Sequence, residues 1–411
     1  VNIWPDIAMA VNMRVMRVVF HDGERYPLLL DVDGIPFWYP TLFATTQHRN
    51  AAQAPNTIAA VLGAIRMLLE WCRGEAIDIQ ARFAQRNFLA QHEIESLCRH
   101  LQAKVKSSNK VVSISGRRRG GEAARAHLQQ SVQRVDTNTQ YIRLTYVADY
   151  LEWLADRLVE REARHVDTDC RAEIQRMVRQ LRARRPKKVR SSRASGRMGL
   201  SPDQRSTLLA LIEPDAERNP FSSNVRERNW LIVRMLYHLG LRQGELLSIQ
   251  NTDLESNALV IPRRHDAKQD PRVNQPTVKT LDQRHPLEPW LYDAIHDYVV
   301  GARRLLPRTR YHQYLFVTHK KGPYCGQPLT SRGLDKVFVK LREAAPESLS
   351  TLSPHVLRHT WNDRFSEWAD EKGIDPAKEE KLRSHLMGWR EGSGTAETYT
   401  RRHRERQAHE A

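Results

Sequence analysis

One stretch of the sequence divides the chain into two halves. Residues 182–197 read RARRPKKVRSSRASGR, with eight arginines and lysines, no acidic residue, and proline, serine and glycine between them. Such a segment does not fold by itself, because it has too few apolar side chains to bury and its like charges repel each other. The chain of 411 residues is also too long for one ordinary hydrophobic core. The sequence therefore predicts two folded parts joined by a basic linker.

The net charge favours a polyanionic partner. The chain has 65 lysines and arginines against 48 acidic residues, a formal charge of +17. Such a surplus is typical of proteins that bind DNA or RNA, although a basic protein of no special affinity has the same balance. In the linker we favour phosphate contacts over a solvated spacer. The predicted DNA-binding residues are Arg184, Arg185, Lys187, Lys188 and Arg190.

The cysteines and the hydropathy indicate where such a chain works. Its four cysteines are widely spaced and form no Cys-x-x-Cys pair, which argues against a disulfide framework and against a thiolate zinc site. No apolar run approaches the roughly 18 residues of a membrane span. No signal segment opens the sequence. We therefore expect a soluble cytoplasmic protein without a membrane partner.

The N-terminal half changes character near residue 50. Residues 1–50 contain VMRVVF and YPLLLDVDGIPFWYP, runs that predict short strands. This β-containing region is either a capping hairpin or an arm that contacts DNA. Residues 51–181 carry apolar side chains at helical spacing, in NTIAAVLGAIRMLLEWC and again in QYIRLTYVADYLEWLADRL, and predict a helical domain. Residues 106–121 within it are polar and glycine-bearing, and predict a basic loop.

The C-terminal half, residues 198–411, reads as a second domain of mixed character. Ser201 is a predicted N-cap, Pro202 suits the first helical position, and Gln204 completes a capping box. Helical patterns follow, interrupted by runs rich in β-branched and aromatic residues. These runs predict strands at residues 258–262, 276–280 and 314–318. The predicted fold class is mainly α with a small β-sheet.

The sequence lacks the motifs of several common nucleotide-binding and metal-binding sites. The sequence has no G-x-x-x-x-G-K-[ST] loop for ATP, no acidic cluster for a pair of magnesium ions, and no H-E-x-x-H or Cys/His spacing for zinc. We therefore predict no metal site and no cofactor. The candidate functional residues that remain are mostly cationic.

The stretch LGLRQGELL places an arginine at a predicted helix start. Gly240 ends one helix, Arg242 lies in the turn, and Glu245 lies in the first turn of the next helix. Backbone amides at a helix start and a guanidinium fork suit a phosphate group. Glu245 is placed to orient Arg242, or is simply an acid favoured by the helix dipole.

A second basic group lies in SPHVLRHTW. His355 and Arg358 are three residues apart, on one face of the predicted helix that Ser353 caps. Arginine keeps its charge and grips oxyanions in a bidentate way, whereas histidine exchanges a proton near neutral pH. In isolation this pair reads as a surface patch. His359 is either a core histidine or a supporting residue.

Taken together, these stretches strongly resemble the tyrosine recombinase family of the phage integrase type. The family pattern is an arginine in G-L-R-x-G-E, then H-x-L-R-H-T, then L-G-H or a tryptophan variant, then a nucleophilic tyrosine. Here GLRQGELL, HVLRHT, LMGW and TAETYT follow in that order. The resemblance covers about residues 198–405. The N-terminal half matches only in its general layout.

The resemblance implies roles for individual residues. Arg242 and Arg358 would bind the non-bridging oxygens of the scissile phosphate. His355 would assist proton transfer or position that phosphate. Trp389 stands where many members have histidine, and an indole donates one N–H but transfers no proton. Tyr399 would be the nucleophile.

The family also uses a lysine on a β-turn between the first arginine and the H-x-x-R block. Lys279, in TVKTLDQRHPL, fits this place best, and Lys268 is its rival. A lysine with a lowered pKa can protonate the leaving 5′ oxygen. Glu245 and His359 are the predicted supporting residues.

What the resemblance implies for function is metal- and ATP-independent cleavage and rejoining of DNA through a 3′-phosphotyrosyl intermediate. The chain would be a site-specific DNA recombinase or integrase of a mobile genetic element. A relaxing enzyme of the type IB topoisomerase kind and a catalytically silent DNA-binding protein are the alternatives. Relaxation without recombinant products would distinguish the first alternative, and binding without any cleavage the second.

The resemblance also implies an architecture and partners. A helical core DNA-binding domain and an α+β catalytic domain would form a C-shaped clamp on DNA. The partners would be double-stranded DNA with specific recombination sites, further copies in a homotetramer on two such sites, and accessory proteins. The expected location is the cytoplasm, at the bacterial nucleoid.

Overall fold

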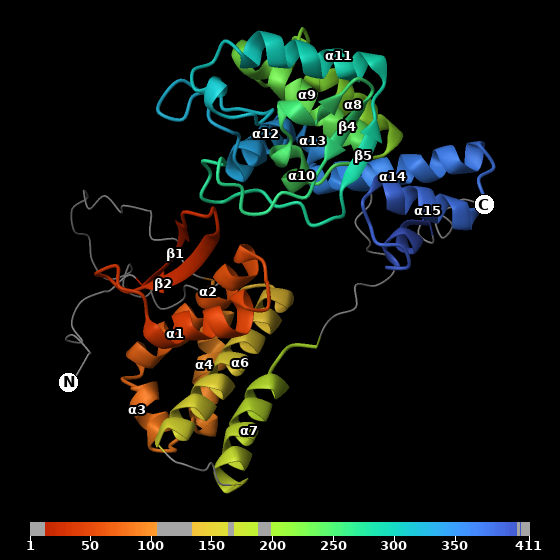
Figure 1. Cartoon of the computed structure of the whole chain (residues 1–411). Helices are drawn as coiled ribbons and strands as arrows, with labels where there is room; N and C mark the ends of the chain where they lie inside the picture. The colour runs from red at the N-terminus through yellow and green to blue at the C-terminus, as the bar shows by residue number, and fades with distance from the viewer. Residues whose placement is uncertain (1–12, 105–133, 163–167, 188–198, 401–402, 404–411) are drawn as a thin grey trace, which may run out of the picture. The chain divides into compact units, whose positions relative to one another are not determined.

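The chain forms two compact units (Figure 1). The computed structural model describes residues 13–104, 134–162, 168–187, 199–400 and 403. The first unit comprises Val1–Val18 and Tyr26–Arg190, and the second comprises Val19–Arg25 and Ser191–Ala411. The predicted basic loop at 106–121 lies outside the described residues, as do residues 188–197 of the predicted linker.

The described residues begin with a hairpin, as the sequence predicts, and then depart from the prediction. Strands β1 (Arg14–Val19) and β2 (Arg25–Leu30) pair with each other. The end of the predicted strand region is instead helical, in α1 (Trp38–Phe43) and the π-helix η1 (Ala44–Arg49). The Asp31 carboxylate accepts the backbone N–H of Ile35 and closes a turn there. Pro40 then fits the first helical turn, where no intrahelical N–H is required.

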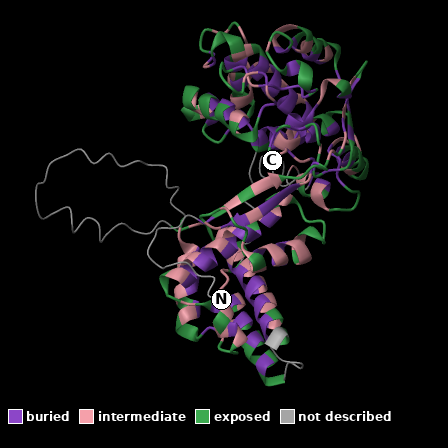
Figure 2. Ribbon diagram, turned by 60° about the vertical axis from the view of Figure 1, so that its left-hand side comes forward, coloured by how far each residue is buried: buried purple, intermediate pink, exposed green. Residues whose placement is uncertain are grey.

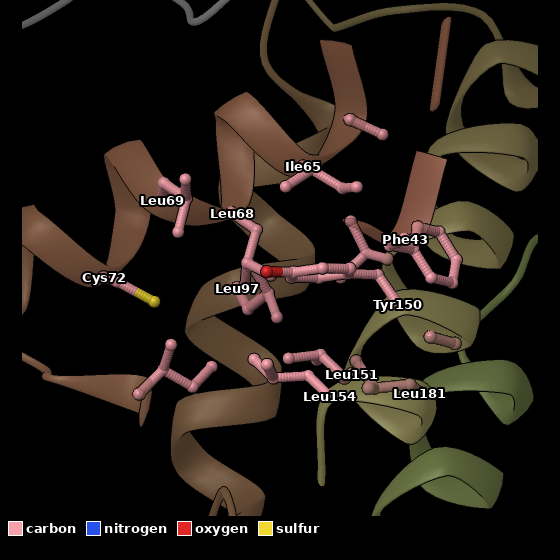
Figure 3. Packing of buried hydrophobic residues seen from close by; sticks show 14 of the residues in the cluster. Phe43, Ile65, Leu68, Leu69, Cys72, Leu97, Tyr150, Leu151, Leu154 and Leu181 are labelled. Atoms are coloured by element: carbon pink, nitrogen blue, oxygen red, sulfur yellow. The ribbon is translucent and has the colours of Figure 1, made fainter. Parts of the chain in front are cut away.

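Helix α6 is the centre of the first unit. It packs on α2, α3, α4 and α7. Its Tyr150 is fully buried and meets Phe43 edge to face, with ring centroids 5.3 Å apart. Figure 3 shows Leu151 and Leu154 of α6 in the same core as Leu68 of α2. The helices are α2 (Pro55–Gly74), α3 (Ile79–Ala84), α4 (Gln91–Gln102), α6 (Thr137–Glu162) and α7 (Thr168–Ala183).

The second unit has its own core, and its helix α8 begins with the predicted capping box. The Ser201 hydroxyl accepts the N–H of Gln204, and the Gln204 side chain returns to Ser201, which completes the capping box of α8. Figure 2 shows the buried residues gathered inside each unit. The helices are α8 (Pro202–Ile212), α9 (Ser223–Leu239), α10 (Gln243–Ser248), η3 (Asn251–Asp253), α11 (Pro289–Tyr298), η4 (Val299–Arg303), η5 (Thr309–Tyr311), α12 (Ser331–Ala344), α13 (Pro346–Leu349), α14 (Pro354–Glu371) and α15 (Pro376–Leu386).

A small antiparallel sheet lies in the second unit, in the order β3 (Leu254–Glu255), β4 (Ala258–Ile261) and β5 (Gln283–Pro286). The strand predicted at residues 258–262 is therefore confirmed. The strand predicted at 276–280 is wrong, because that segment is irregular and precedes β5. The run at 314–318 makes only isolated bridges.

The alternating burial of residues 276–280 explains that error. Pro276, Val278 and Thr280 are buried, whereas Lys279 between the last two is exposed. This period of two imitates a strand, although the segment packs against α10 and not beside another strand. A Cβ atom added to Gly244 of α10 would lie 2.5 Å from the Thr277 carbonyl oxygen.

The chain as described is mainly helical with two small sheets, so the predicted fold class is confirmed. Across the described ranges, none of the helices has both the length and the apolar character that a bilayer span requires.

Candidate active site

The turn between α9 and α10 presents Arg242. Helix α9 ends at Gly240, whose φ of +64° suits glycine, and the Gly240 N–H bonds to the Leu236 carbonyl. Arg242 is the N-cap residue of α10. The Glu245 carboxylate accepts the Arg242 backbone N–H at 2.7 Å and its guanidinium at 3.0 Å. This is the contact that the sequence predicts for Glu245.

Arg358 also lies close to the Glu245 carboxylate. Its side chain comes from α14, is 2% exposed, and donates to the Gly240 carbonyl at 2.7 Å. Its Nη1 also lies 3.5 Å from Glu245 Oε2. The Nη2 atom is buried without a hydrogen-bond partner in the part of the chain that the structure describes. An unused buried donor of this kind is rare and needs an explanation.

The charges of these three residues leave a positive surplus. Burial raises the pKa of Glu245, but the charges of Arg358 and Arg242 and the Arg242 N–H outweigh it, so the pKa is lower than usual. Burial and, to a smaller extent, the charge of Arg242 lower the pKa of Arg358 to about 10, although the charge of Glu245 opposes this shift. At neutral pH two cations therefore face one anion.

Tyr399 lies against Trp389. Residues 395–400 are helical, and the half-buried Tyr399 ring stacks on the indole, with centroids 5.5 Å apart and planes 9° apart. The Arg358 guanidinium carbon is 5.3 Å from the centroid of the Trp389 ring. The indole Nε1 is buried, and among the described residues it has no hydrogen-bond partner. Tyrosine, indole and guanidinium therefore form one cluster.

The two histidines of α14 extend this cluster. His355 is exposed, and its ring meets that of His359 edge to face at 4.4 Å. The His359 ring centroid is in turn 5.6 Å from that of Tyr399. The structure thus brings His355, His359, Arg358, Trp389 and Tyr399 together.

The two candidate lysines differ in their surroundings. Both side chains are exposed. Lys279 precedes the buried Thr280, whose hydroxyl donates to Glu245 Oε1 at 2.8 Å. The backbone next to Lys279 is therefore attached to the carboxylate that holds the two arginines. Lys268 lies in a turn, and the structure gives it no such attachment to Glu245.

The predicted DNA-binding residues of the linker are only partly described. Arg184 and Arg185 directly follow α7. Arg184 pairs with Glu95 at 3.1 Å, and the Arg185 guanidinium lies 5.0 Å from the centroid of the Tyr141 ring. Lys187 is exposed, whereas Lys188 and Arg190 lie outside the described residues.

Sequence reasoning missed a fully buried cation beside Tyr399. Arg383 of α15 donates to Ser366 Oγ at 2.6 Å and to the Asn362 carbonyl at 3.1 Å, and it pairs with Glu379. Its guanidinium carbon is 5.9 Å from the Tyr399 ring centroid. The only signal in the sequence is the four-residue spacing of Glu379 and Arg383, which is common on exposed helices.

Thr280, Gln283 and His285, which are buried near Glu245, were also missed. They lie in the motif TVKTLDQRHPL, which was read only for its lysine. Within the described ranges, no group of three or more His, Cys, Asp or Glu side chains is arranged to hold a metal ion.

The likeness to solved structures is weak, and the sequence identity is low. The XerH site-specific recombinase bound to palindromic difH substrate, a post-cleavage complex, has a TM-score of 0.44 and 13% identity, covering 90% of this chain and 92% of that one. The XerA recombinase has a TM-score of 0.36 and 16% identity, covering 90% and 97%. The Tn1549 transposon integrase in complex with transposon right end DNA has a TM-score of 0.39 and 16% identity, covering 70% and 97%.

The sequence comparisons identify the family. The tyrosine recombinase XerC of Bacillus pumilus (strain SAFR-032) is 27% identical over 158 residues, which are 37% of this chain and 46% of that protein. The chain thus matches about half the length of this curated relative. The model of the phage integrase family matches residues 200–406, just over half of the chain, and spans the whole cluster around Tyr399. The chain belongs to the phage integrase family.

Proposed function

We propose that the chain is a site-specific DNA recombinase that breaks and rejoins DNA through a covalent bond to Tyr399. The observation that carries this proposal is the stacking of Tyr399 on Trp389, whose ring also meets the Arg358 guanidinium. A candidate nucleophile and a candidate phosphate-binding cation therefore contact the same indole. Membership of the phage integrase family supports the same reading.

The unused donors beside Tyr399 support a phosphate site. Arg358 Nη2 and Trp389 Nε1 are both buried, and neither bonds to any other part of the chain that is described. A phosphate oxygen would satisfy both N–H groups. During attack on a phosphodiester, negative charge grows on these oxygens, and fixed donors in a site with little water stabilise it. Arg242 would add a third, partly exposed donor.

In the proposed reaction the Tyr399 oxygen bonds to phosphorus, and the bond from phosphorus to the 5′ oxygen breaks. The phenol, with an ordinary pKa of about 10, gives up its proton, for which His355 is the proposed acceptor. The 5′ oxygen takes a proton from Lys279. Attack by a 5′ hydroxyl on the phosphotyrosyl bond reverses these steps and rejoins DNA. The phosphotyrosyl bond conserves the energy of the broken bond, so rejoining needs no ATP.

Lys279 is preferred over Lys268 as the general acid. Its neighbour Thr280 bonds to Glu245, which also holds Arg242. A lysine on a segment that bonds to the carboxylate holding Arg242 would be better positioned for a phosphate bound by Arg242 than a lysine in a separate turn. Replacing Lys279 with alanine should therefore block cleavage, and a 5′ leaving group that needs no proton, such as a bridging phosphorothiolate, should restore it. Lys268→Ala should cleave normally.

We further propose that double-stranded DNA with specific recombination sites is the substrate, that four copies act on two such sites, and that the two units close on DNA as a C-shaped clamp. The net charge of +17 supports a DNA partner. A role in moving a genetic element, the help of accessory proteins and action at the bacterial nucleoid belong to the same proposal.

A covalent trap tests the proposed function. The protein is incubated with a library of nicked DNA duplexes and denatured, and DNA that stays attached to protein is sequenced. Tyr399→Phe is the decisive variant, and Tyr311→Phe, which changes an exposed tyrosine, is the matched control. Adducts with the wild type and the control, but not with Tyr399→Phe, are expected, and their sequences would give the target site.

Other outcomes separate the alternatives. Adducts together with relaxation of supercoiled plasmid, and without recombinant products, would indicate an enzyme of the type IB topoisomerase kind. Specific DNA binding without any adduct would indicate a silent binding protein. Adducts that persist in Tyr399→Phe would assign the nucleophile to another residue.

A further inference from the structure

A chain of buried hydrogen bonds extends from Glu245 away from the arginines. Thr280 Oγ1 donates to Glu245 Oε1 at 2.8 Å, and Gln283 Nε2 donates to Thr280 Oγ1 at 2.7 Å. Gln283 Oε1 lies 3.0 Å from His285 Nε2. The exposed fractions are 0% for Glu245, 6% for Thr280, 2% for Gln283 and 3% for His285. We call these four residues the Glu245 network.

The hydrogen bonds of the Glu245 network have one consistent direction. The amide nitrogen of Gln283 faces Thr280, so its oxygen faces His285 and accepts a hydrogen bond from the N–H of His285 Nε2. The hydroxyl of Thr280 accepts from Gln283 and donates its only proton to Glu245. Losing one member therefore leaves a buried neighbour without its partner, which is costly away from water.

The Glu245 network touches three separate parts of the candidate active site. Glu245 holds Arg242 and faces Arg358, while Thr280 directly follows Lys279. The third part is the turn that precedes Trp389. The Gly388 carbonyl accepts the Leu281 N–H at 3.0 Å, and a Cβ atom on Gly388 would lie 2.7 Å from Gln283 Cγ.

We propose that Thr280 and Gln283 are positioning residues that hold the two arginines, the Lys279 segment and the Trp389 turn in one fixed arrangement before DNA binds. Neither residue needs to touch the phosphate. Their contribution is to keep Arg242 of α10, the Lys279 segment before β5 and the Trp389 turn after α15 in fixed positions relative to one another. The consequence for cleavage rests on the proposed function.

Conservative substitutions can distinguish a loss of this positioning role from a loss of overall protein stability. Thr280→Val keeps the shape of the side chain but removes the hydroxyl, whereas Thr280→Ser keeps the hydroxyl. Gln283→Met keeps the length of the side chain but removes both hydrogen bonds. Thr309→Val is the matched control, because Thr309 is also buried in the second unit and its hydroxyl donates only to the nearby Leu306 carbonyl.

Hydrogen–deuterium exchange followed by mass spectrometry tests the arrangement without DNA. The reporters are the amides of Arg242 and Leu281, which bond to Glu245 and to the Gly388 carbonyl. Both amides should exchange about tenfold faster in Thr280→Val and in Gln283→Met. They should exchange at the wild-type rate in Thr280→Ser and in Thr309→Val. Unchanged exchange in Thr280→Val and Gln283→Met would overturn the proposal.

Single-turnover cleavage of the DNA recovered in the covalent trap tests the consequence. Thr280→Val and Gln283→Met should form the adduct about tenfold more slowly at unchanged DNA affinity, because only the arrangement of the reacting groups is lost. Thr280→Ser should cleave like the wild type. The double variant should be no slower than either single variant, since both break the same hydrogen-bonded chain.

A failure of the positioning role can be distinguished from a failure of the proposed function. Wild-type cleavage rates in Thr280→Val, or slowing that multiplies in the double variant, would overturn the positioning role. A wild-type protein that forms no adduct would refute the proposed function, while the exchange measurement would still decide whether the Glu245 network fixes the three parts.

Discussion

At the residue scale, Trp389 combines two properties that a single side chain seldom provides together. Its ring stacks on Tyr399, and its buried Nε1 has no hydrogen-bond partner among the residues described. A histidine at this place would offer a donor but a smaller stacking surface. Indole cannot take up or release a proton under ordinary conditions, so any proton transfer falls to other residues.

Trp389→Phe should separate the stacking from the hydrogen bond. Phenylalanine keeps an aromatic ring against Tyr399 but loses the N–H donor. Adduct formation should slow about 100-fold, the usual effect of removing one donor to a developing oxyanion, with DNA affinity unchanged. Single-turnover kinetics give the rate, and Trp389→His should recover part of it. A rate for Trp389→Phe equal to that of the wild type would show that the indole acts through packing alone.

His285 should make the second unit sensitive to acid. Burial lowers the pKa of His285 to about 4, against an ordinary 6.5, with smaller effects from Glu245, Arg358 and His385. The unfolded chain binds a proton as the pH falls through 6.5, whereas the folded chain binds it only near 4. The stability contributed by the neutral ring is therefore complete above pH 6.5 and is lost as the pH falls towards 4.

The measurement is the free energy of unfolding in urea at two pH values. Between about pH 7.5 and about pH 5, His285 should account for a loss of about 2 kcal/mol. His285→Gln, which keeps an N–H donor but does not titrate, should lose correspondingly less. The same pH dependence in both proteins would assign the acid sensitivity to other groups, of which His238 and His319 also have pKa values lowered to about 4 by burial.

At the element scale, the close approach of α10 to the Lys279 segment depends on Gly244. An added Cβ atom would lie 2.5 Å from the Thr277 carbonyl oxygen, which belongs to the backbone and cannot rotate away. Gly244→Ala should therefore push this segment from α10 and destabilise the second unit by about 1–3 kcal/mol. Chemical denaturation measures the effect.

Gly63 is the matched control in a helix of the first unit. Apart from the chain around Gly63 itself, no described atom lies within 4 Å of a Cβ atom added there, and its backbone is helical. Gly63→Ala should raise stability by about 0.5–1 kcal/mol, because alanine has the higher helix propensity. A loss of stability at Gly63 as large as at Gly244 would mean that close approach is not the cause.

The elements that could be predicted from sequence are those with local signals. Ser201 and Gln204 mark a helix start, and Gly240 marks a helix end, through hydrogen bonds to residues nearby in the chain. The segment 276–280 has the β-branched residues and the alternating burial of a strand, but in the folded chain it lies against α10, which is distant in sequence. Periodicity alone reports which side chains are buried and not what buries them.

The residues of the candidate site also differ in how far the sequence could predict them. Arg242 and Glu245 could be paired from their spacing, and the resemblance to a family supplied the roles assigned to Arg358 and Tyr399. Gln283 and Arg383 had no such signal. Their importance depends on the contact of Gln283 with Thr280 and on the contacts of Arg383 with Asn362 of α14 and with Tyr399, which only the folded chain creates.

At the scale of the whole molecule, each unit has a hydrophobic core of its own. One core contains described residues between Met13 and Leu181, and the other contains residues between Leu200 and Leu357. Calorimetry should therefore show two unfolding transitions. Leu154→Ala and Leu236→Ala, each in one core, should lower the midpoint of one transition, with a cost of about 2–5 kcal/mol in that unit. One shared transition that both substitutions lower equally would contradict this.

The stacking of Tyr399 on the Trp389 of its own chain has a genetic consequence. A chain with Tyr399→Phe and a chain with Arg358→Gln each lack one part of the proposed site. If the parts came from different copies, mixing the two defective proteins would recreate some complete sites. Because one chain supplies both parts here, the two alleles should fail to complement each other, in the test tube or in a cell that expresses both.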